Sequence, residues 1–203
     1  MSPIRFSRPL LFIGLTGCLA ATSGCDASPT DPNPQELITQ VRITLTNTAD
    51  ATNVVTITAS DPDGDGAGIT FSPASAPLRQ GATYTGIITL DDTVNGESIT
   101  EEIEEEADEH LFRYAFAPSA AGTVTLTDRE SDYGGSRDLP VGLAFRAEVA
   151  ASATGSGALN AILYHFDEEP KTSGTATSDE IDVDIDFPVT FVGAGVADGG
   201  TGR

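Results

Sequence analysis

The sequence lacks tryptophan and is poor in cysteine, lysine and histidine. Both cysteines, Cys18 and Cys25, lie near the start, so we expect neither a disulfide nor a nucleophilic thiol in the rest of the chain. Lys171 is the one lysine among ten basic residues, which face 31 acidic residues, and the formal net charge is −21. A field of this sign repels nucleic acid and anionic headgroups. We therefore expect no nucleic-acid partner and a solvated acidic surface, with specific cation binding as the alternative.

Sequence motifs of common enzyme classes are also missing. The chain contains no G-x-S-x-G elbow, no phosphate-binding loop and no H-E-x-x-H zinc motif. Its carboxylates are too numerous to single out a pair of the kind that glycosidases use. With two histidines and no thiol beyond the first 25 residues, nucleophilic catalysis has few candidates. The sequence therefore predicts a protein that is not an enzyme.

Residues 1–25 have the pattern of a secretory signal, with arginines before an apolar stretch that is too short to span a bilayer. Cys18 and Cys25 each follow a small residue, in L-T-G-C and T-S-G-C, and each resembles the cysteine that bacterial lipoproteins acylate. We predict lipidation at Cys25, because cleavage before Cys18 leaves too little apolar length. Cys18 is the alternative, and a cleaved leader without lipid is the other interpretation.

A proline-rich segment follows the predicted leader. Three prolines within residues 26–35 exclude a helix and a central strand, and they predict a semi-extended tether. No later segment is long and apolar enough for a transmembrane helix. The expected location is the cell envelope, with the chain anchored in the outer membrane through its acylated cysteine and facing the periplasm or the surface.

From Glu36 the apolar residues alternate with polar ones, as in strands buried on one face. Such runs lie at 37–45, 55–59, 84–90, 112–116, 124–126, 141–149 and 181–191, and residues 158–166 are apolar on both faces. Glycine-rich turn signals separate the runs. The pattern predicts an all-β domain over residues 36–193, an antiparallel β-sandwich of the Ig-like, Greek-key type. A closed barrel and two half-sized modules meeting near residue 130 are the alternatives.

Two segments depart from this pattern. Residues 98–109 carry apolar residues every four positions, which suits a helix, but Ile99–Ile103 also has the pattern of an edge strand. We favour the strand because the neighbouring segments are strands. Residues 194–203 form a glycine-rich tail that we expect to be disordered.

The first candidate binding site is the run Asp61-Pro62-Asp63-Gly64-Asp65-Gly66. Its three carboxylates, those of Asp61, Asp63 and Asp65, lie in a tight glycine-containing loop, and calcium binds six to eight such oxygens. The twelfth position, where an EF-hand has glutamate, is Ser72. The loop is therefore a calcium candidate outside the EF-hand pattern, and an acidic hairpin turn is the alternative.

The second candidate joins the two histidines, His110 and His165, each of which is flanked by carboxylates and aromatic residues. If their segments are neighbouring strands, the pair can ligate zinc or copper with the help of a glutamate or aspartate. Axial ligation of haem is a further option, and two ordinary sheet histidines are the alternative. A third feature is the stripe Asp182, Asp184 and Asp186, which strand alternation places on one, solvent-facing, sheet face.

Several segments resemble a family of small lipoproteins of Bacteroidota, many of which carry the label "type 1 periplasmic binding fold superfamily protein". The segments are 34–39, 61–66, 82–86 and, most distinctively, the acidic block 99–110 that ends in Asp-Glu-His. The resemblance covers most of residues 34–192 and implies export, anchoring and an association with outer-membrane transporters. The family label implies a two-lobed α/β fold, whereas the alternation here favours the all-β sandwich.

Taken together, these patterns predict a membrane-anchored lipoprotein that binds a cation or small ligand without acting on it. Its expected partners are the lipid bilayer and an outer-membrane receptor. The alternative is a structural or protein-interaction lipoprotein without a small-molecule ligand.

Overall fold

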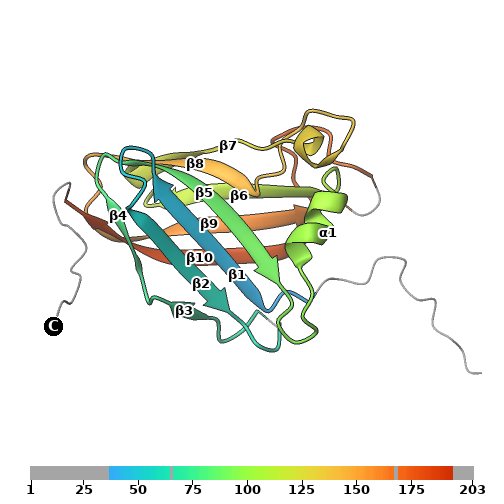
Figure 1. Ribbon diagram of the computed structural model, residues 1–203, viewed down its shortest axis with the longest axis horizontal. Helices are drawn as coiled ribbons and strands as arrows, with labels where there is room; N and C mark the ends of the chain where they lie inside the picture. The colour runs from blue at the N-terminus through green and yellow to red at the C-terminus, as the bar shows by residue number, and fades with distance from the viewer. Residues whose placement is uncertain (1–36, 65, 167–168, 194–203) are drawn as a thin grey trace, which may run out of the picture. The chain divides into compact units, whose positions relative to one another are not determined.

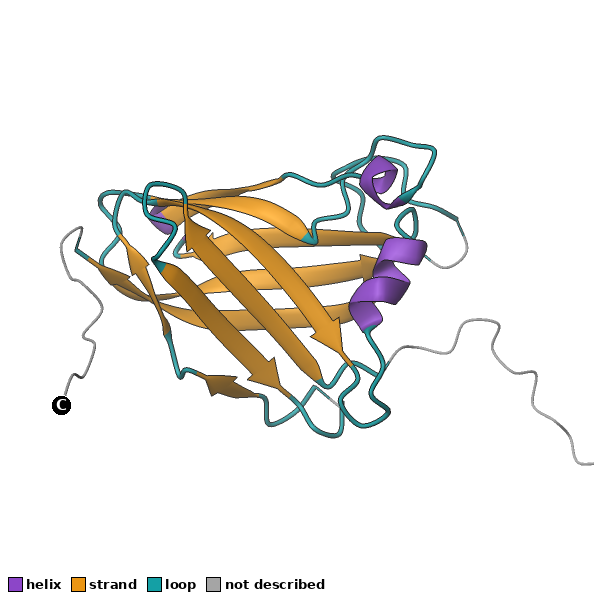
Figure 2. Cartoon of the chain, viewed as in Figure 1, coloured by secondary structure: helices purple, strands orange, loops and turns teal. Residues whose placement is uncertain are grey.

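The computed structural model describes residues 37–64, 66–166 and 169–193, which consist mainly of β-strands (Figure 1, Figure 2). Two sheets pack together, which confirms the predicted all-β sandwich and excludes the closed barrel. The larger sheet has the strand order β3 (Thr70–Ser72), β2 (Val54–Ser60), β1 (Gln40–Asn47), β5 (Thr83–Asp91), β8 (Ala144–Val149) and β7 (Gly122–Leu126). The smaller sheet has the order β4 (Ala76–Arg79), β10 (Glu180–Val192), β9 (Gly155–His165) and β6 (His110–Ala117). β4 runs parallel to β10, and the other described strand pairs are antiparallel.

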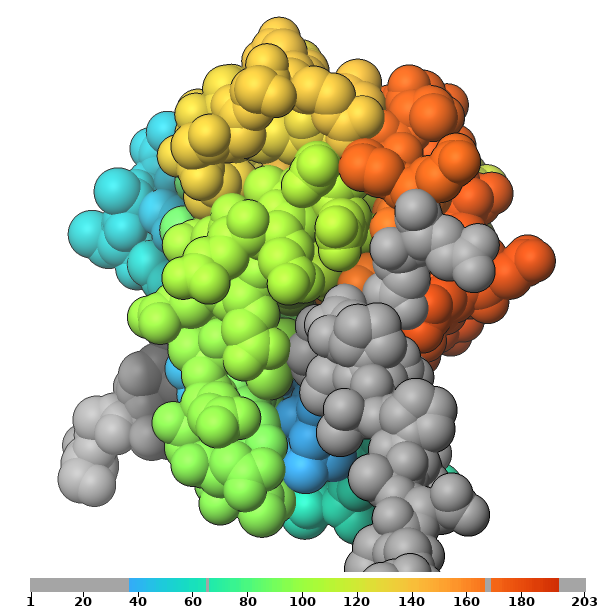
Figure 3. All heavy atoms as spheres, turned by 90° about the vertical axis from the view of Figure 1, so that its right-hand side faces the viewer, coloured from blue at the N-terminus to red at the C-terminus, as the bar shows by residue number. Residues whose placement is uncertain are grey.

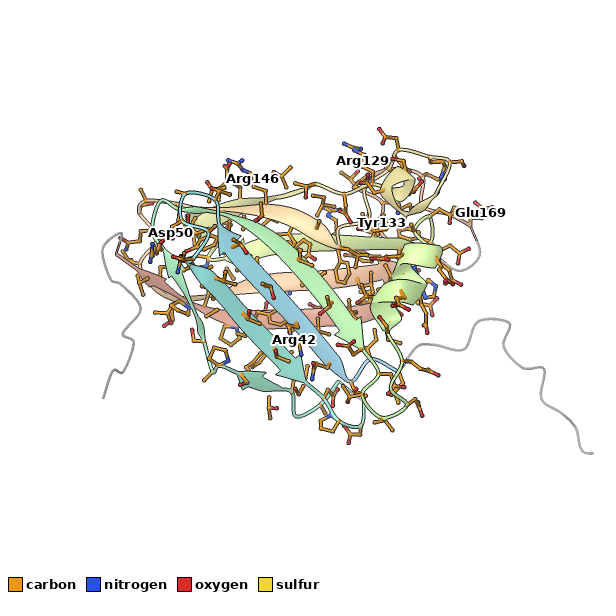
Figure 4. The ribbon with its side chains drawn as sticks, in the orientation of Figure 1. Arg42, Asp50, Arg129, Tyr133, Arg146 and Glu169 are labelled. Atoms are coloured by element: carbon orange, nitrogen blue, oxygen red, sulfur yellow. The ribbon has the colours of Figure 1, made fainter. Side chains whose placement is uncertain are left out.

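The core lies between the sheets and is built by strand alternation. On β1 the inward residues Val41, Ile43 and Leu45 are buried, while Arg42 lies on the outer face, where its Nε donates to Thr58 Oγ1 at 3.4 Å (Figure 4). Both sheets contain strands from before and after residue 130, and one hydrophobic cluster spans them. The alternative of two modules meeting near residue 130 is therefore wrong.

The segment 98–109 contains a helix and a turn and not the edge strand that we favoured. α1 (Ile99–Glu105) covers one end of the sandwich (Figure 1). Its apolar residues Ile99 and Ile103 lie one turn apart and are both buried. Ser98 caps the helix by accepting a hydrogen bond from the Glu101 N–H at 3.4 Å. The four-residue spacing thus predicted the structure better than the neighbouring strands did.

The strand predicted over 141–149 begins only at Ala144. Gly142 has a φ of 96°, which strand backbone does not adopt, and the Asp128 carboxylate accepts hydrogen bonds from the N–H groups of Gly142 and Leu143, both at 2.8 Å.

Two 3₁₀ turns, η1 (Ser119–Ala121) and η2 (Glu130–Tyr133), follow β6 and β7. The short strands β3 and β4 were not predicted from the sequence, because three or four residues carry too little periodicity.

Several predictions lie outside the described residues. They concern the leader 1–25 with Cys18 and Cys25, the tether 26–35, Asp65 of the calcium candidate, and the tail 194–203. In the part of the chain that the structure does describe, no helix has the length and apolar character needed to cross a membrane.

Candidate metal centre

The two histidines form one rung at the end of the smaller sheet. β6 begins at His110 and β9 ends at His165, and the antiparallel register pairs these two residues directly. On the other side of β9, His165 pairs with Glu180, the first residue of β10. The imidazole rings stack with their centroids 4.4 Å apart and their planes at 22°. The structure thus brings together both histidines that the sequence singled out.

A β-bulge adds a carboxylate to this rung. The register of β10 against β9 shifts between Ile181 and Val183, so Asp182 is the extra residue on the bulged strand. Its side chain is 1% exposed, and its Oδ2 lies 3.5 Å from His165 Nδ1. The prediction that Asp182 shares a solvent-facing stripe with the next two aspartates is therefore wrong.

The other two members of that stripe do lie outside. Asp184 and Asp186 are exposed, and each accepts a hydrogen bond from Asn160 Nδ2, at 2.9 and 3.1 Å. The same strand therefore presents two carboxylates to solvent and one to the interior. Bulges commonly redirect a side chain next to a functional site.

A second carboxylate comes from the turn before β6. Glu106 follows α1, and its backbone oxygen lies 3.2 Å from His110 Nδ1. A carbonyl oxygen can only accept, so this contact places the His110 proton on Nδ1 and the lone pair on Nε2. The Asp182 carboxylate beside His165 Nδ1 favours the same tautomer there. A carbonyl or carboxylate behind the imidazole is the usual arrangement around metal-binding histidines.

The geometry defines two overlapping ligand groups. One ligand atom each from Glu106, His110 and His165 lies within 4.8 Å of the others, and the same holds for His165, Glu180 and Asp182. Among the described residues, these are the groups of three or more such side chains that come within reach of one ion. Imidazole with carboxylate suits zinc and copper. The stacked rings exclude axial haem ligation, which requires the two histidines on opposite faces of the macrocycle.

Lys171 holds the backbone under this rung, and sequence reasoning did not assign it a role. Its Nζ donates to the backbone oxygens of Ala107 and His110, the latter at 2.7 Å, and lies 3.3 Å from Glu130 Oε1. Both side chains of this ion pair are fully buried. Burial lowers the pKa of the Lys171 ammonium, and the Glu130 carboxylate opposes that shift.

The Lys171 contacts tie three loops to the histidine end of the sandwich. Arg137 Nε lies 3.3 Å from Glu130 Oε2, and the Lys171 N–H donates to Asp108 O at 3.0 Å. Figure 3 shows this end, where the segments around α1, around residue 130 and after residue 169 lie side by side. Tyr133 lies in the second of these segments (Figure 4). The single lysine of a strongly acidic chain was the available signal for this role.

The calcium candidate follows β2. Asp61 is 8% exposed, and its Oδ2 accepts the Gly66 N–H at 2.7 Å, which closes the loop. Asp63 is exposed, and Asp65 lies outside the described residues. The contacts described here are those of a carboxylate-closed turn, and calcium binding at Asp61, Asp63 and Asp65 stays a prediction.

A cleft of about 470 Å³ lies between the ends of β1 and β2 and the first half of β10. Asp61 lines it on one side and Asp182 on the other. Asp182 therefore belongs both to the lining of the cleft and to the surroundings of His165, which its carboxylate contacts.

Comparison with protein-family models, curated proteins and solved structures finds no match to this chain.

Proposed function

We propose that the protein is a membrane-anchored, non-enzymatic binding module of the cell envelope that captures a zinc or copper ion at the His110–His165 rung. The leader with its lipobox-like cysteines supports the anchor, and the resemblance to envelope lipoproteins supports a transporter-associated receptor as partner. The observation that carries the metal proposal is the bulge that turns Asp182 inward against His165.

The cost of this arrangement supports a function. His110 is fully buried and His165 is 2% exposed. Burying imidazoles and carboxylates costs more free energy than burying apolar side chains of the same size. Four chain segments, around α1 and in β6, β9 and β10, supply these groups to one place. Imidazole and carboxylate groups are the donors that zinc and copper sites use.

In the proposed site His110 and His165 ligate the ion through Nε2, and Glu106 supplies the carboxylate. Asp182 holds the proton on His165 Nδ1 and so orients that ring. Because the two imidazole rings are stacked, their Nε2 lone pairs are close to parallel. Ion binding therefore requires the rings to tilt apart until both lone pairs point at the ion. A fourth position is left for water or for a group handed on to a partner.

The test is calorimetry with zinc and with copper on purified protein that carries Cys18→Ser and Cys25→Ser, so that thiols do not bind metal. We expect one ion per chain and loss of binding in His110→Gln with His165→Gln. Asp182→Asn should weaken binding about 10- to 100-fold, as changes behind a metal-ligating histidine usually do.

The matched control is Asp184→Asn with Asp186→Asn, which removes two carboxylates from the outer face of the same strand. Binding should stay at the parent level in this variant. Equal affinity in the parent and in the double-histidine variant would refute the metal site. It would leave the structural or protein-interaction lipoprotein as the better proposal.

A further inference from the structure

The cleft between the sheets has the size and position of a small-molecule site. The β10 residues that line it lie within 181–185, outside the stretch Val189–Val192 along which β4 pairs with β10. Among the described strands none covers the first half of β10 on that side. The volume of about 470 Å³ lies in the usual range for ligand pockets.

The walls of the cleft select against anions and very polar ligands. Apolar residues line it, among them Leu37 and Ile69, which precede β1 and β3, and Ile181 and Ile185 of β10. Among the described residues of the lining, the ionisable ones are Asp61, Asp182 and Asp184, the last with its side chain exposed, and none is a lysine, arginine or histidine. Together with the net charge of −21, this composition attracts cations that carry an apolar body.

Asp61 gives the cleft a specific acceptor. The residue is 92% buried, as its exposed fraction of 8% shows, and its Oδ2 is taken by the Gly66 N–H. Its Oδ1 is also buried, and no described residue donates a hydrogen bond to it. A buried carboxylate oxygen without a donor costs free energy. A ligand N–H group recovers part of that cost when the Asp61 side chain turns and brings Oδ1, which is closed to solvent, to the cleft that the residue lines.

We propose that this cleft binds a small organic cation, a primary ammonium group on an apolar body, with the ammonium at Asp61 Oδ1. An ammonium brings up to three N–H donors and a compact charge. A bare hard cation fits less well, because calcium requires at least six oxygen ligands and much of the described lining is apolar. The inference goes beyond the metal site and does not depend on it.

The experiment uses three probes of one shape: 4-phenylbutylamine, 4-phenylbutan-1-ol and 4-phenylbutanoate. Each is titrated into EDTA-treated protein by NMR or calorimetry. The amine should bind, and the alcohol should bind about tenfold to a hundredfold more weakly, as expected for losing a charged hydrogen bond. The carboxylate should not bind.

Two variants test the position of the ammonium. Asp61→Asn should weaken binding of the amine about tenfold or more, while Asp63→Asn, which removes the same charge from an exposed side chain of the same loop, should leave it unchanged. Ile181→Lys places a cation at the rim of the cleft, where the side chain is 43% exposed, so it should weaken the amine and spare the alcohol. If Asp61→Asn fails to fold, Ile181→Lys still tests the charge preference of the cleft, because it changes an exposed side chain.

Three outcomes would overturn the inference. In the first, amine and alcohol bind equally. In the second, Asp61→Asn and Asp63→Asn weaken the amine to the same extent, which indicates only the general acidic field. In the third, calcium binds the parent protein and is lost in both aspartate variants while the amine does not bind. If the parent protein binds the amine but does not bind zinc or copper, the metal proposal is refuted and this inference is left intact.

Discussion

The loops after β2 and β7 each bury one aspartate, and the two carboxylates differ in their hydrogen bonds. Asp128 is 6% exposed and accepts from Gly142 N, Leu143 N and Tyr133 OH, at 2.8 to 2.9 Å, so both of its oxygens are used. Asp61 is 8% exposed and accepts one described hydrogen bond, from Gly66 N. Equal burial therefore has different consequences: Asp128 stabilises the fold, whereas Asp61 keeps one acceptor for a ligand.

Glu130 is a third buried carboxylate, and it differs from Asp61 and Asp128 because it forms a buried ion pair with Lys171. We expect Lys171→Met to lower the free energy of unfolding by about 3–5 kcal/mol, because it leaves Glu130 buried and frees the backbone oxygens of Ala107 and His110. Urea denaturation measures the loss. Lys171→Met with Glu130→Gln should recover part of it, since the variant buries no unpaired charge. A loss below about 1 kcal/mol in the single variant would mean that Arg137 alone satisfies Glu130.

Asp128→Ala should produce the next largest effect. It removes three hydrogen bonds and leaves two buried backbone N–H groups without an acceptor, so we expect a loss of about 3 kcal/mol. Urea denaturation of this variant beside Asp61→Ala tests the comparison directly. Similar losses in both variants would contradict it.

Much of the fold, but little of the site, was predictable from the sequence. Strands such as β1 and β10 are recognisable in the sequence, because burial of one strand face makes apolar and polar residues alternate. The pairing of His110 with His165 depends on the neighbouring positions of β6 and β9, which lie 55 residues apart at the paired histidines and leave no local pattern. The inward turn of Asp182 depends on a register shift that alternation itself conceals.

Lys171 and Asp61 show the same limit. A lysine in a strongly acidic chain is expected at the surface, yet Lys171 is buried, and the backbone oxygens of Ala107 and His110 and the Glu130 carboxylate satisfy its ammonium. The Asp61 loop was recognised as a turn with carboxylates. Its position at an apolar cleft could not be predicted, because the cleft forms only where β10 lies next to this loop in the fold. Composition therefore identified the residue types that matter and left their surroundings open.

Alkaline pH should weaken the Asp128 loop selectively. Burial and the neighbouring Asp128 carboxylate raise the pKa of Tyr133 above its ordinary value of 10.0, and the same two causes raise that of Tyr114. A raised folded-state pKa adds stability that is present below pH 10 and lost as the pH rises further, because the unfolded chain ionises first. Between pH 8 and 11 we expect the parent protein to lose about 1 kcal/mol more than Tyr133→Phe, a figure reduced for the partial exposure of the ring. Parallel losses in the two proteins would show that Tyr133 does not respond to Asp128.

The smallest expected effect belongs to Asp61→Asn. The asparagine oxygen can still accept the Gly66 N–H, and the substitution removes a charge whose second oxygen is buried without a described donor. We expect the free energy of unfolding to stay within about 0.5 kcal/mol of the parent or to rise slightly. Urea denaturation beside Asp63→Asn, which serves as the exposed control, measures it. A loss of about 2 kcal/mol or more would place Asp61 with Asp128 among the structural carboxylates, because only a carboxylate that the fold requires gives a loss of that size. A stable Asp61→Asn that no longer binds the amine would instead show that the burial of this charge serves the ligand.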